Sequence, residues 1–140
     1  MVSFYRKNKR RGKCIAEMGY GKFNFIRAIY MACWDPEFAL HYVGWDDLKW
    51  SDAKVPFPKG LLYLLALPDC DGELSNKEIK AVCKALSKNK VFVEGKQFPS
   101  LVWGNWKNGW MNDLEWRKEA QKFFDMLQDC AKRGCGIEWL

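Results

Sequence analysis

The centre of the chain reads Leu67-Pro68-Asp69-Cys70-Asp71-Gly72-Glu73-Leu74-Ser75-Asn76-Lys77-Glu78, which is close to the pattern of an EF-hand calcium loop. Such a loop has oxygen donors at positions 1, 3, 5, 9 and 12 and a glycine at position 6. Here the matching donors are Asp69, Asp71, Ser75 and Glu78. Position 1 is Leu67, which offers no side-chain oxygen. An apolar run over 60–66 and a helical stripe over 76–87 flank the loop, so the sequence predicts an EF-hand-like helix–loop–helix.

The same residues also fit a metal-free turn that begins a helix. Ser75 and Glu78 have the spacing of a capping box, in which each side chain bonds the backbone N–H of the other residue. The Asp-Cys-Asp-Gly segment before them is typical of a turn. Because the missing first carboxylate lowers the affinity for a hard cation, we interpret the stretch as a structural turn. A calcium site at Asp69, Asp71, Ser75 and Glu78 is the alternative.

Composition indicates one folded domain. The chain has 140 residues, of which 49% are hydrophobic and 16% aromatic, which excludes a disordered protein. No apolar run reaches the ~18 residues that a membrane-spanning helix needs, and the start lacks the apolar core of a secretory signal. We therefore expect a cytoplasmic protein without a membrane partner. The six cysteines include no Cys-x-x-Cys pair, so we expect reduced thiols and no zinc.

The net charge of +6 lies entirely in the first residues of the chain. The cations there, with no acidic residue among them, are Arg6, Lys7, Lys9, Arg10, Arg11 and Lys13. We predict a flexible basic arm over 1–13, followed by a single globular domain over 14–140. Such an arm can bind nucleic acid by releasing counterions from phosphates, or it can be a solvated terminus with no partner.

The remaining segments predict a mainly α (α+β) fold, a single helical domain with a small two- or three-stranded sheet. Helices are expected over 22–34, 36–43 and 113–133, and the second begins with an N-cap at Asp35. Short strands are expected over 14–18 and 91–93. The tail over 136–140 is expected to be a final strand paired with 14–18.

The sequence does not predict an enzyme. The single imidazole, His41, falls in an expected helix, and neither a phosphate-binding glycine loop nor a dinucleotide fingerprint occurs. A binding role is better supported by a glycine- and asparagine-rich segment whose candidate contacts are Trp103, Trp106, Lys107 and Trp110. Indole faces stack on bases, although these tryptophans can equally fill the core. Tyr20, Lys22 and Arg27, near a helix N-terminus, could add an anion pocket.

Three features together resemble an uncharacterised family of small proteins from phages and their bacterial hosts. They are Gly19-Tyr20-Gly21-Lys22-Phe23 followed by Arg27, the segment Asp69-Cys70-Asp71-Gly72-Glu73-Leu74-Ser75, and a closing helix that ends in a strand. The family tends to have histidine and serine where this chain has Leu67 and Pro68. The resemblance implies a phage or prophage setting and carries no known activity.

These observations lead to one main hypothesis and two alternatives. The main hypothesis is a non-catalytic, phage-encoded binding protein that sequesters an anionic, base-containing ligand, such as a nucleotide immune signal, or inhibits a host defence protein. One alternative is a calcium-binding, EF-hand-like module. The other is a nucleic-acid-binding accessory protein that acts through its basic arm. The sequence is also compatible with a homo-oligomer.

Overall fold

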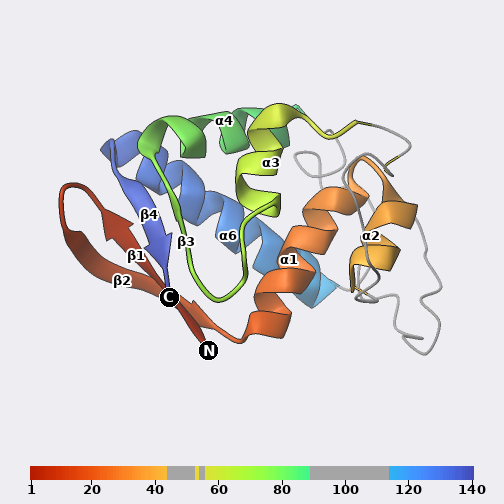
Figure 1. Ribbon diagram of the computed structural model, residues 1–140, viewed down its shortest axis with the longest axis horizontal. Helices are drawn as coiled ribbons and strands as arrows, with labels where there is room; N and C mark the ends of the chain where they lie inside the picture. The colour runs from red at the N-terminus through yellow and green to blue at the C-terminus, as the bar shows by residue number, and fades with distance from the viewer. Residues whose placement is uncertain (44–52, 54–55, 89–113) are drawn as a thin grey trace.

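The computed structural model describes residues 1–43, 53, 56–88 and 114–140, and in these ranges the chain forms one antiparallel sheet and five helices (Figure 1). The strands are β1 (Val2–Lys7), β2 (Arg11–Met18), β3 (Gly72–Leu74) and β4 (Gly136–Trp139). The helices are α1 (Tyr20–Ala32), α2 (Pro36–Val43), α3 (Lys59–Leu65), α4 (Asn76–Ser87) and α6 (Leu114–Arg133). The strand order is β2-β1-β4-β3, so the first and last strands of the chain pair in the centre of the sheet.

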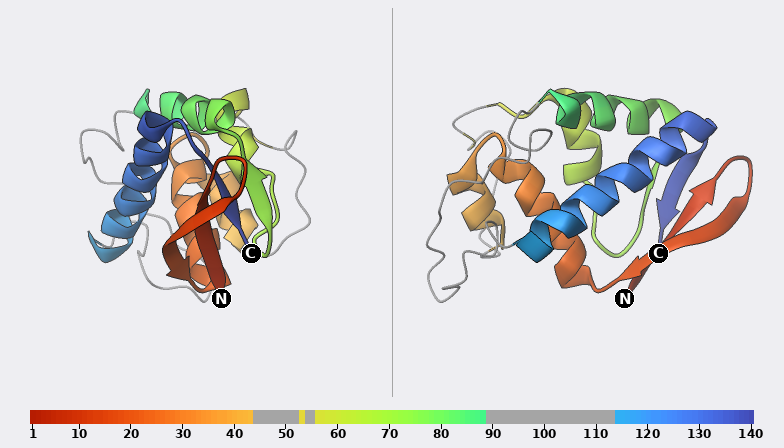
Figure 2. Two further views of the ribbon diagram at one scale, coloured as in Figure 1. Left: turned by 90° about the vertical axis from the view of Figure 1, so that its left-hand side faces the viewer. Right: turned by 180° about the vertical axis from the view of Figure 1, so that it is seen from behind.

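The two faces of the sheet have different characters, because side chains alternate along each strand. Phe4 pairs with Trp139 and Leu74 pairs with Ile137, and all four side chains are buried on the inner face. Helices α1, α4 and α6 lie on this inner side (Figure 2). The outer face carries polar and charged side chains, which are Ser3, Tyr5, Lys7, Arg11, Glu17, Glu73 and Glu138.

An aromatic cluster joins the sheet to the helices. The Phe4 ring lies 5.1 Å from the Phe23 ring of α1 and 5.4 Å from the Phe123 ring of α6, both edge to face. Trp139 is fully buried against the Phe4 and Phe23 rings, and its indole N–H donates to the Pro68 carbonyl at 3.1 Å. Such pairs contribute ~0.5–1.5 kcal/mol each beyond the burial of their area. The cluster therefore fixes the ends of the chain in the core.

The packing around Trp139 explains why residue 72 is a glycine, without reference to a calcium loop. A Cβ atom at Gly72 would lie 2.2 Å from Trp139 Cζ2, so no larger residue fits there. The glycine that sits at position 6 of the expected calcium loop is thus explained by the close approach of β3 to an indole ring.

Most helix predictions are confirmed. Helix α2 begins after Asp35, whose carboxylate accepts the Phe38 N–H at 3.0 Å. Helix α4 has the expected range and buries its predicted stripe. Helix α6 ends at Arg133 and is followed by Gly134 with φ of +70°, a left-handed C-cap. Helix α1 begins and ends two residues earlier than expected.

The predicted fold class is wrong. A mainly α domain with a two- or three-stranded sheet was expected, whereas the described residues form a four-stranded antiparallel sheet with helices on one side. The missed strand content lies chiefly in the expected arm. Val2 and Phe4 are fully buried, and 2–7 is a central strand. The expected EF-hand-like loop is instead the edge strand β3 followed by the first turn of α4.

The predicted pairing of the tail is also wrong. Strand β4 pairs with β1 and β3, and the segment 14–18 pairs with β1 on its far side. The strand expected over 91–93 lies outside the described residues. Among the described helices, none is long and apolar enough to cross a membrane.

Candidate nucleic-acid interface

The cations of residues 6–13 lie on a β-hairpin formed by β1, a turn over 8–10 and β2. In the turn, the Asn8 N–H donates to the Arg10 carbonyl at 3.3 Å. Every residue from Asn8 to Cys14 is exposed. The tip of the hairpin extends beyond the end of the sheet at which β4 begins (Figures 1 and 2). The predicted basic segment is therefore an ordered, projecting structure.

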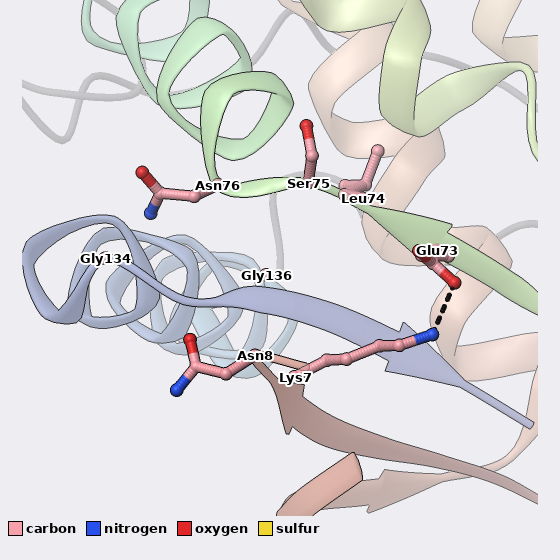
Figure 3. Close-up of a pocket in the computed structure, with 8 residues that line it drawn as sticks. All are labelled: Lys7, Asn8, Glu73, Leu74, Ser75, Asn76, Gly134 and Gly136. Atoms are coloured by element: carbon pink, nitrogen blue, oxygen red, sulfur yellow. Dashed lines mark hydrogen bonds and ion pairs between the residues drawn. The ribbon is translucent and has the colours of Figure 1, made fainter. Parts of the chain in front are cut away.

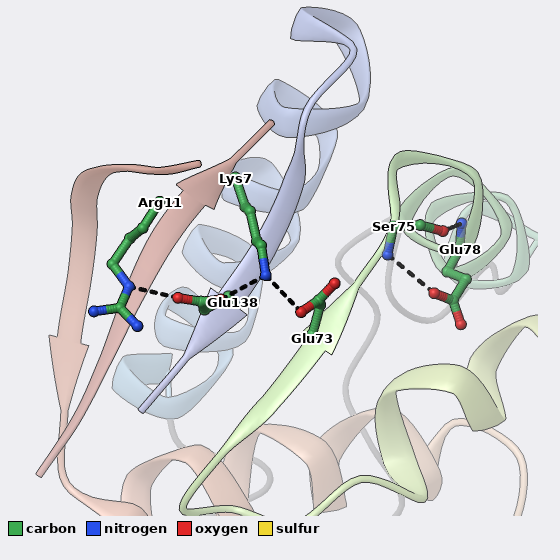
Figure 4. Close-up of polar contacts among 6 residues, drawn as sticks. All are labelled: Lys7, Arg11, Glu73, Ser75, Glu78 and Glu138. Carbon is green, nitrogen blue, oxygen red and sulfur yellow. Dashed lines mark hydrogen bonds and ion pairs between the residues drawn. The ribbon is translucent and has the colours of Figure 1, made fainter. Parts of the chain in front are cut away.

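Two of the six cations hold the hairpin in place. Arg11 Nε lies 2.5 Å from Glu138 Oε1, and Lys7 Nζ lies 2.8 Å from Glu138 Oε2 (Figure 4). Lys7 Nζ also lies 2.7 Å from Glu73 Oε2. These ion pairs form a continuous row across all four strands on the outer face of the sheet. Arg11 additionally lies over the Tyr5 ring, 5.1 Å from its centroid.

The protonation states in this row follow from the geometry. Hydrogen bonds from Lys7 and then from Arg11 hold the pKa of Glu138 below its ordinary value. Hydrogen bonds to Glu138 and Glu73 raise the pKa of Lys7. Both groups are therefore charged at neutral pH, and the charges of Lys7 and Arg11 are neutralised by carboxylates.

Three other cations are available to a partner. Lys9, Arg10 and Lys13 are exposed, and none of them has an ion-pair partner among the residues that the structure describes. They lie at the tip and on the free edge strand β2. Arg6 differs again: it stands opposite Ile137 on the inner face, and its Nε is buried without a hydrogen-bond acceptor. The six predicted cations thus divide into three free ones, two anchors and one partly buried one.

The expected calcium ligands are engaged in other bonds. Asp69 Oδ2 accepts from Asn24 Nδ2 at 2.8 Å. The Ser75 hydroxyl accepts the Glu78 N–H at 3.1 Å, and the Glu78 carboxylate accepts the Ser75 N–H at 3.0 Å, which confirms the predicted capping box. Within the described part of the chain, no three His, Cys, Asp or Glu side chains are grouped so that they could hold a metal ion. Asp71 is exposed at the turn.

The expected anion pocket near the start of α1 is not assembled from its three residues. The Tyr20 side chain is exposed, and Lys22 Nζ lies 2.8 Å from Glu119 Oε2 of α6. Arg27 is only 2% exposed and donates to the backbone carbonyls of Leu64 and Leu67. Burial lowers its pKa, and its guanidinium carbon lies 4.4 Å from the centroid of the Phe23 ring. Arg27 therefore acts as a structural residue that joins α1 to the end of α3.

The other half of that predicted site lies outside the described residues. It comprises Trp103, Trp106, Lys107 and Trp110. Their role as a stacking surface stays a prediction.

A polar notch opens beside the turn end of the hairpin, where β1 leads into residue Asn8 (Figure 3). It has a volume of about 260 Å³ and is lined by Lys7, Asn8, Glu73, Leu74, Ser75, Asn76, Gly134 and Gly136. The lining comes from the hairpin, from the β3–α4 junction and from the α6–β4 turn. Sequence reasoning missed both this notch and the anchoring role of Glu138. The only local signal was the alternation of polar and apolar residues in Gly136-Ile137-Glu138-Trp139.

No protein-family model, no curated protein and no solved structure matches the chain. The fold and the interface therefore define it only by class, as an α+β protein with a basic β-hairpin at one end of its sheet. The resemblance to small phage and bacterial proteins stays a prediction.

Proposed function

We propose that this protein binds nucleic acid through the tip of the β1–β2 hairpin. The observation that carries the proposal is the presence of three exposed cations, Lys9, Arg10 and Lys13, which have no ion-pair partner among the described residues. They lie on a projecting hairpin with no acidic residue between them. Phosphate contacts of this kind supply most of the affinity in sequence-independent binding. A preformed hairpin also loses less conformational entropy on binding than a flexible arm does.

The ion-pair row supports this role by placing the hairpin. Glu138 forms ion pairs with Lys7 and Arg11, so these two cations are not free to bind phosphates. The same ion pairs hold both strands of the hairpin against β4. The free positive charge is consequently concentrated at the tip. This distribution favours a polyanion that lies across the end of the sheet.

The phage setting, the cytoplasmic location and a role against host defence remain proposals. They derive from the resemblance. A small anionic ligand held by Tyr20, Lys22 and Arg27 has less support, because Lys22 is paired and Arg27 is buried.

The proposal is tested by removing the tip cations and comparing a control with the same loss of charge. The test variant is K9A/R10A/K13A. The control is K80A/K84A/K88A, whose lysines are exposed and lie along α4 and at its end, away from the hairpin. Binding of a labelled oligonucleotide is measured by fluorescence anisotropy at low salt. We expect the hairpin variant to bind at least tenfold more weakly than the control; equal affinities of the two variants would refute the proposal.

A further inference from the structure

None of the described side chains fills the notch beside the hairpin. Its floor is the start of β4 at Gly136, which stands opposite Lys7 on the outer face and brings no side chain to it. A Cβ atom at Gly136 would lie 2.6 Å from the Leu74 carbonyl oxygen, so the position requires glycine. At about 260 Å³, the notch is smaller than the ~300–1,000 Å³ typical of sites for drug-sized ligands. It suits a single base-sized group.

The notch offers hydrogen bonds without a net positive charge. Among the described residues that line it, Lys7 is the only cation, and Glu73 and Glu138 neutralise that charge. This charge balance disfavours a phosphate in the notch and favours a neutral polar group.

Two carboxamides, those of Asn8 and Asn76, lie on opposite sides of the α6–β4 segment that carries Gly134 and Gly136 (Figure 3). The Asn8 side chain has no hydrogen-bond partner within the described parts of the chain. Asn76 Nδ2 donates to the carbonyls of Cys130, Ala131 and Cys135 at 3.0–3.4 Å, which fixes the amide. Its Oδ1 has no hydrogen-bond donor among the residues that the structure describes. Carboxamides recognise the edges of nucleobases because they present a donor and an acceptor in one plane.

The notch also lies next to the free cations. Asn8, one of its walls, directly precedes Lys9 and Arg10 in the hairpin turn. A base held in the notch would therefore belong to a nucleotide whose neighbouring phosphates reach the tip. A base in such a recess cannot remain paired within a duplex, so the ligand would be single-stranded or locally unpaired.

We propose that this notch binds one base of a single-stranded nucleic acid whose phosphates lie on the hairpin tip. The inference rests on the proposed function and assigns it a ligand class. It makes Asn8 and Asn76 the base-contacting residues, and Lys9 and Arg10 the phosphate-contacting residues.

The test compares two single-stranded oligonucleotides of equal length, one normal and one in which every base is replaced by an abasic site. For the wild-type protein, we expect the abasic strand to bind about 5- to 150-fold more weakly, the range that corresponds to ~1–3 kcal/mol for one well-placed base. The K9A/R10A/K13A variant should bind both oligonucleotides more weakly, and the ratio of its two affinities should equal that of the wild-type protein. The N8A variant should reduce the ratio of the affinity for the normal strand to that for the abasic strand at least threefold, while its affinity for the abasic strand stays unchanged.

The outcomes separate this inference from the proposed function. If K9A/R10A/K13A weakens binding but the wild-type protein binds both strands equally, the base site is refuted and the phosphate site stands. A folded N8A protein with an unchanged ratio also refutes the base site. If N8A does not fold, the base site is tested by photo-cross-linking the wild-type protein to a single strand that contains a halogenated pyrimidine. A cross-link to residues 7–8 or 73–76 supports the inference, and cross-links confined to other segments overturn it.

Discussion

Glu138 is the residue on which the position of the hairpin depends most. Glu138 is only 9% exposed, and its carboxylate bridges Lys7 and Arg11. We expect E138Q to lower the melting temperature at neutral pH, because the amide loses both ion pairs. E73Q, which alters one exposed partner of Lys7, should lower it less.

The pH dependence of this effect has a defined sign. The folded-state pKa of Glu138 lies below its ordinary value, so its stabilisation is complete above the unfolded pKa and is lost as the pH falls through the folded pKa. The difference in melting temperature between wild type and E138Q should therefore shrink in acid. A difference that is constant from neutral pH to below the ordinary glutamate range would contradict this assignment.

Arg27 should contribute to stability without contributing to binding. Replacing it by methionine keeps the packing against Phe23 but removes the guanidinium donor of the Leu64 and Leu67 carbonyls. Among the described residues, it also leaves Asn24 Oδ1 with only the Tyr42 hydroxyl as donor. We expect R27M to lower the free energy of unfolding by about 2–3 kcal/mol, measured by urea denaturation. Oligonucleotide affinity at a temperature where the variant is folded should not change. A loss of affinity in folded R27M would place Arg27 in the binding site.

At the scale of elements, the junction of β3 and α4 is expected to act as a helix cap and not as a metal loop. S75A should lower the free energy of unfolding by about 1 kcal/mol, because it removes the cap of α4. S87A removes a hydroxyl that bonds only within α4, to the Cys83 carbonyl, and should have a smaller effect.

The same junction predicts no response to calcium. Asp69 is bonded to Asn24, and Ser75 and Glu78 are bonded to each other. Millimolar calcium should therefore leave the melting temperature unchanged, whereas ligand binding to the folded state would raise it. A rise that D71N abolishes would restore the calcium hypothesis.

The helices could be predicted from the sequence because their signals are local. Helix α4 has a capping box and an apolar stripe within its own range, and α2 has a capping aspartate followed by a proline. Strand β1 has no comparable local signal, because its apolar residues, Val2 and Phe4, adjoin a run of cations that resembles a solvated tail. Its assignment depends on pairing with β4 at the opposite end of the chain, which local patterns do not encode.

The candidate site could be predicted only in part for the same reason. The cations of the hairpin were identified from charge alone, but the division into anchors and free cations depends on Glu138, which the fold brings from the C-terminal strand. The notch depends on three junctions that are distant in sequence.

At the scale of the whole molecule, the six free cysteines provide a probe of the fold. Cys14 and Cys70 are exposed. Burial raises the pKa of Cys33 and Cys130 to about 12 and that of Cys83 to about 11, and Cys135 is buried. Since the thiolate is the reactive form, we expect two thiols to react rapidly with a disulfide reagent at neutral pH and the other four only on unfolding. Rapid reaction of more than two would contradict the described packing.

The most direct test of the central claim is the salt dependence of single-stranded oligonucleotide binding, measured for the wild-type protein and for K9A/R10A/K13A. Each phosphate contact contributes about −0.7 to the slope of log K against log salt concentration for single strands. Engagement of the three free cations therefore predicts a wild-type slope steeper than that of the variant by about 2. Equal slopes for the two proteins would show that the hairpin tip does not contact the nucleic acid.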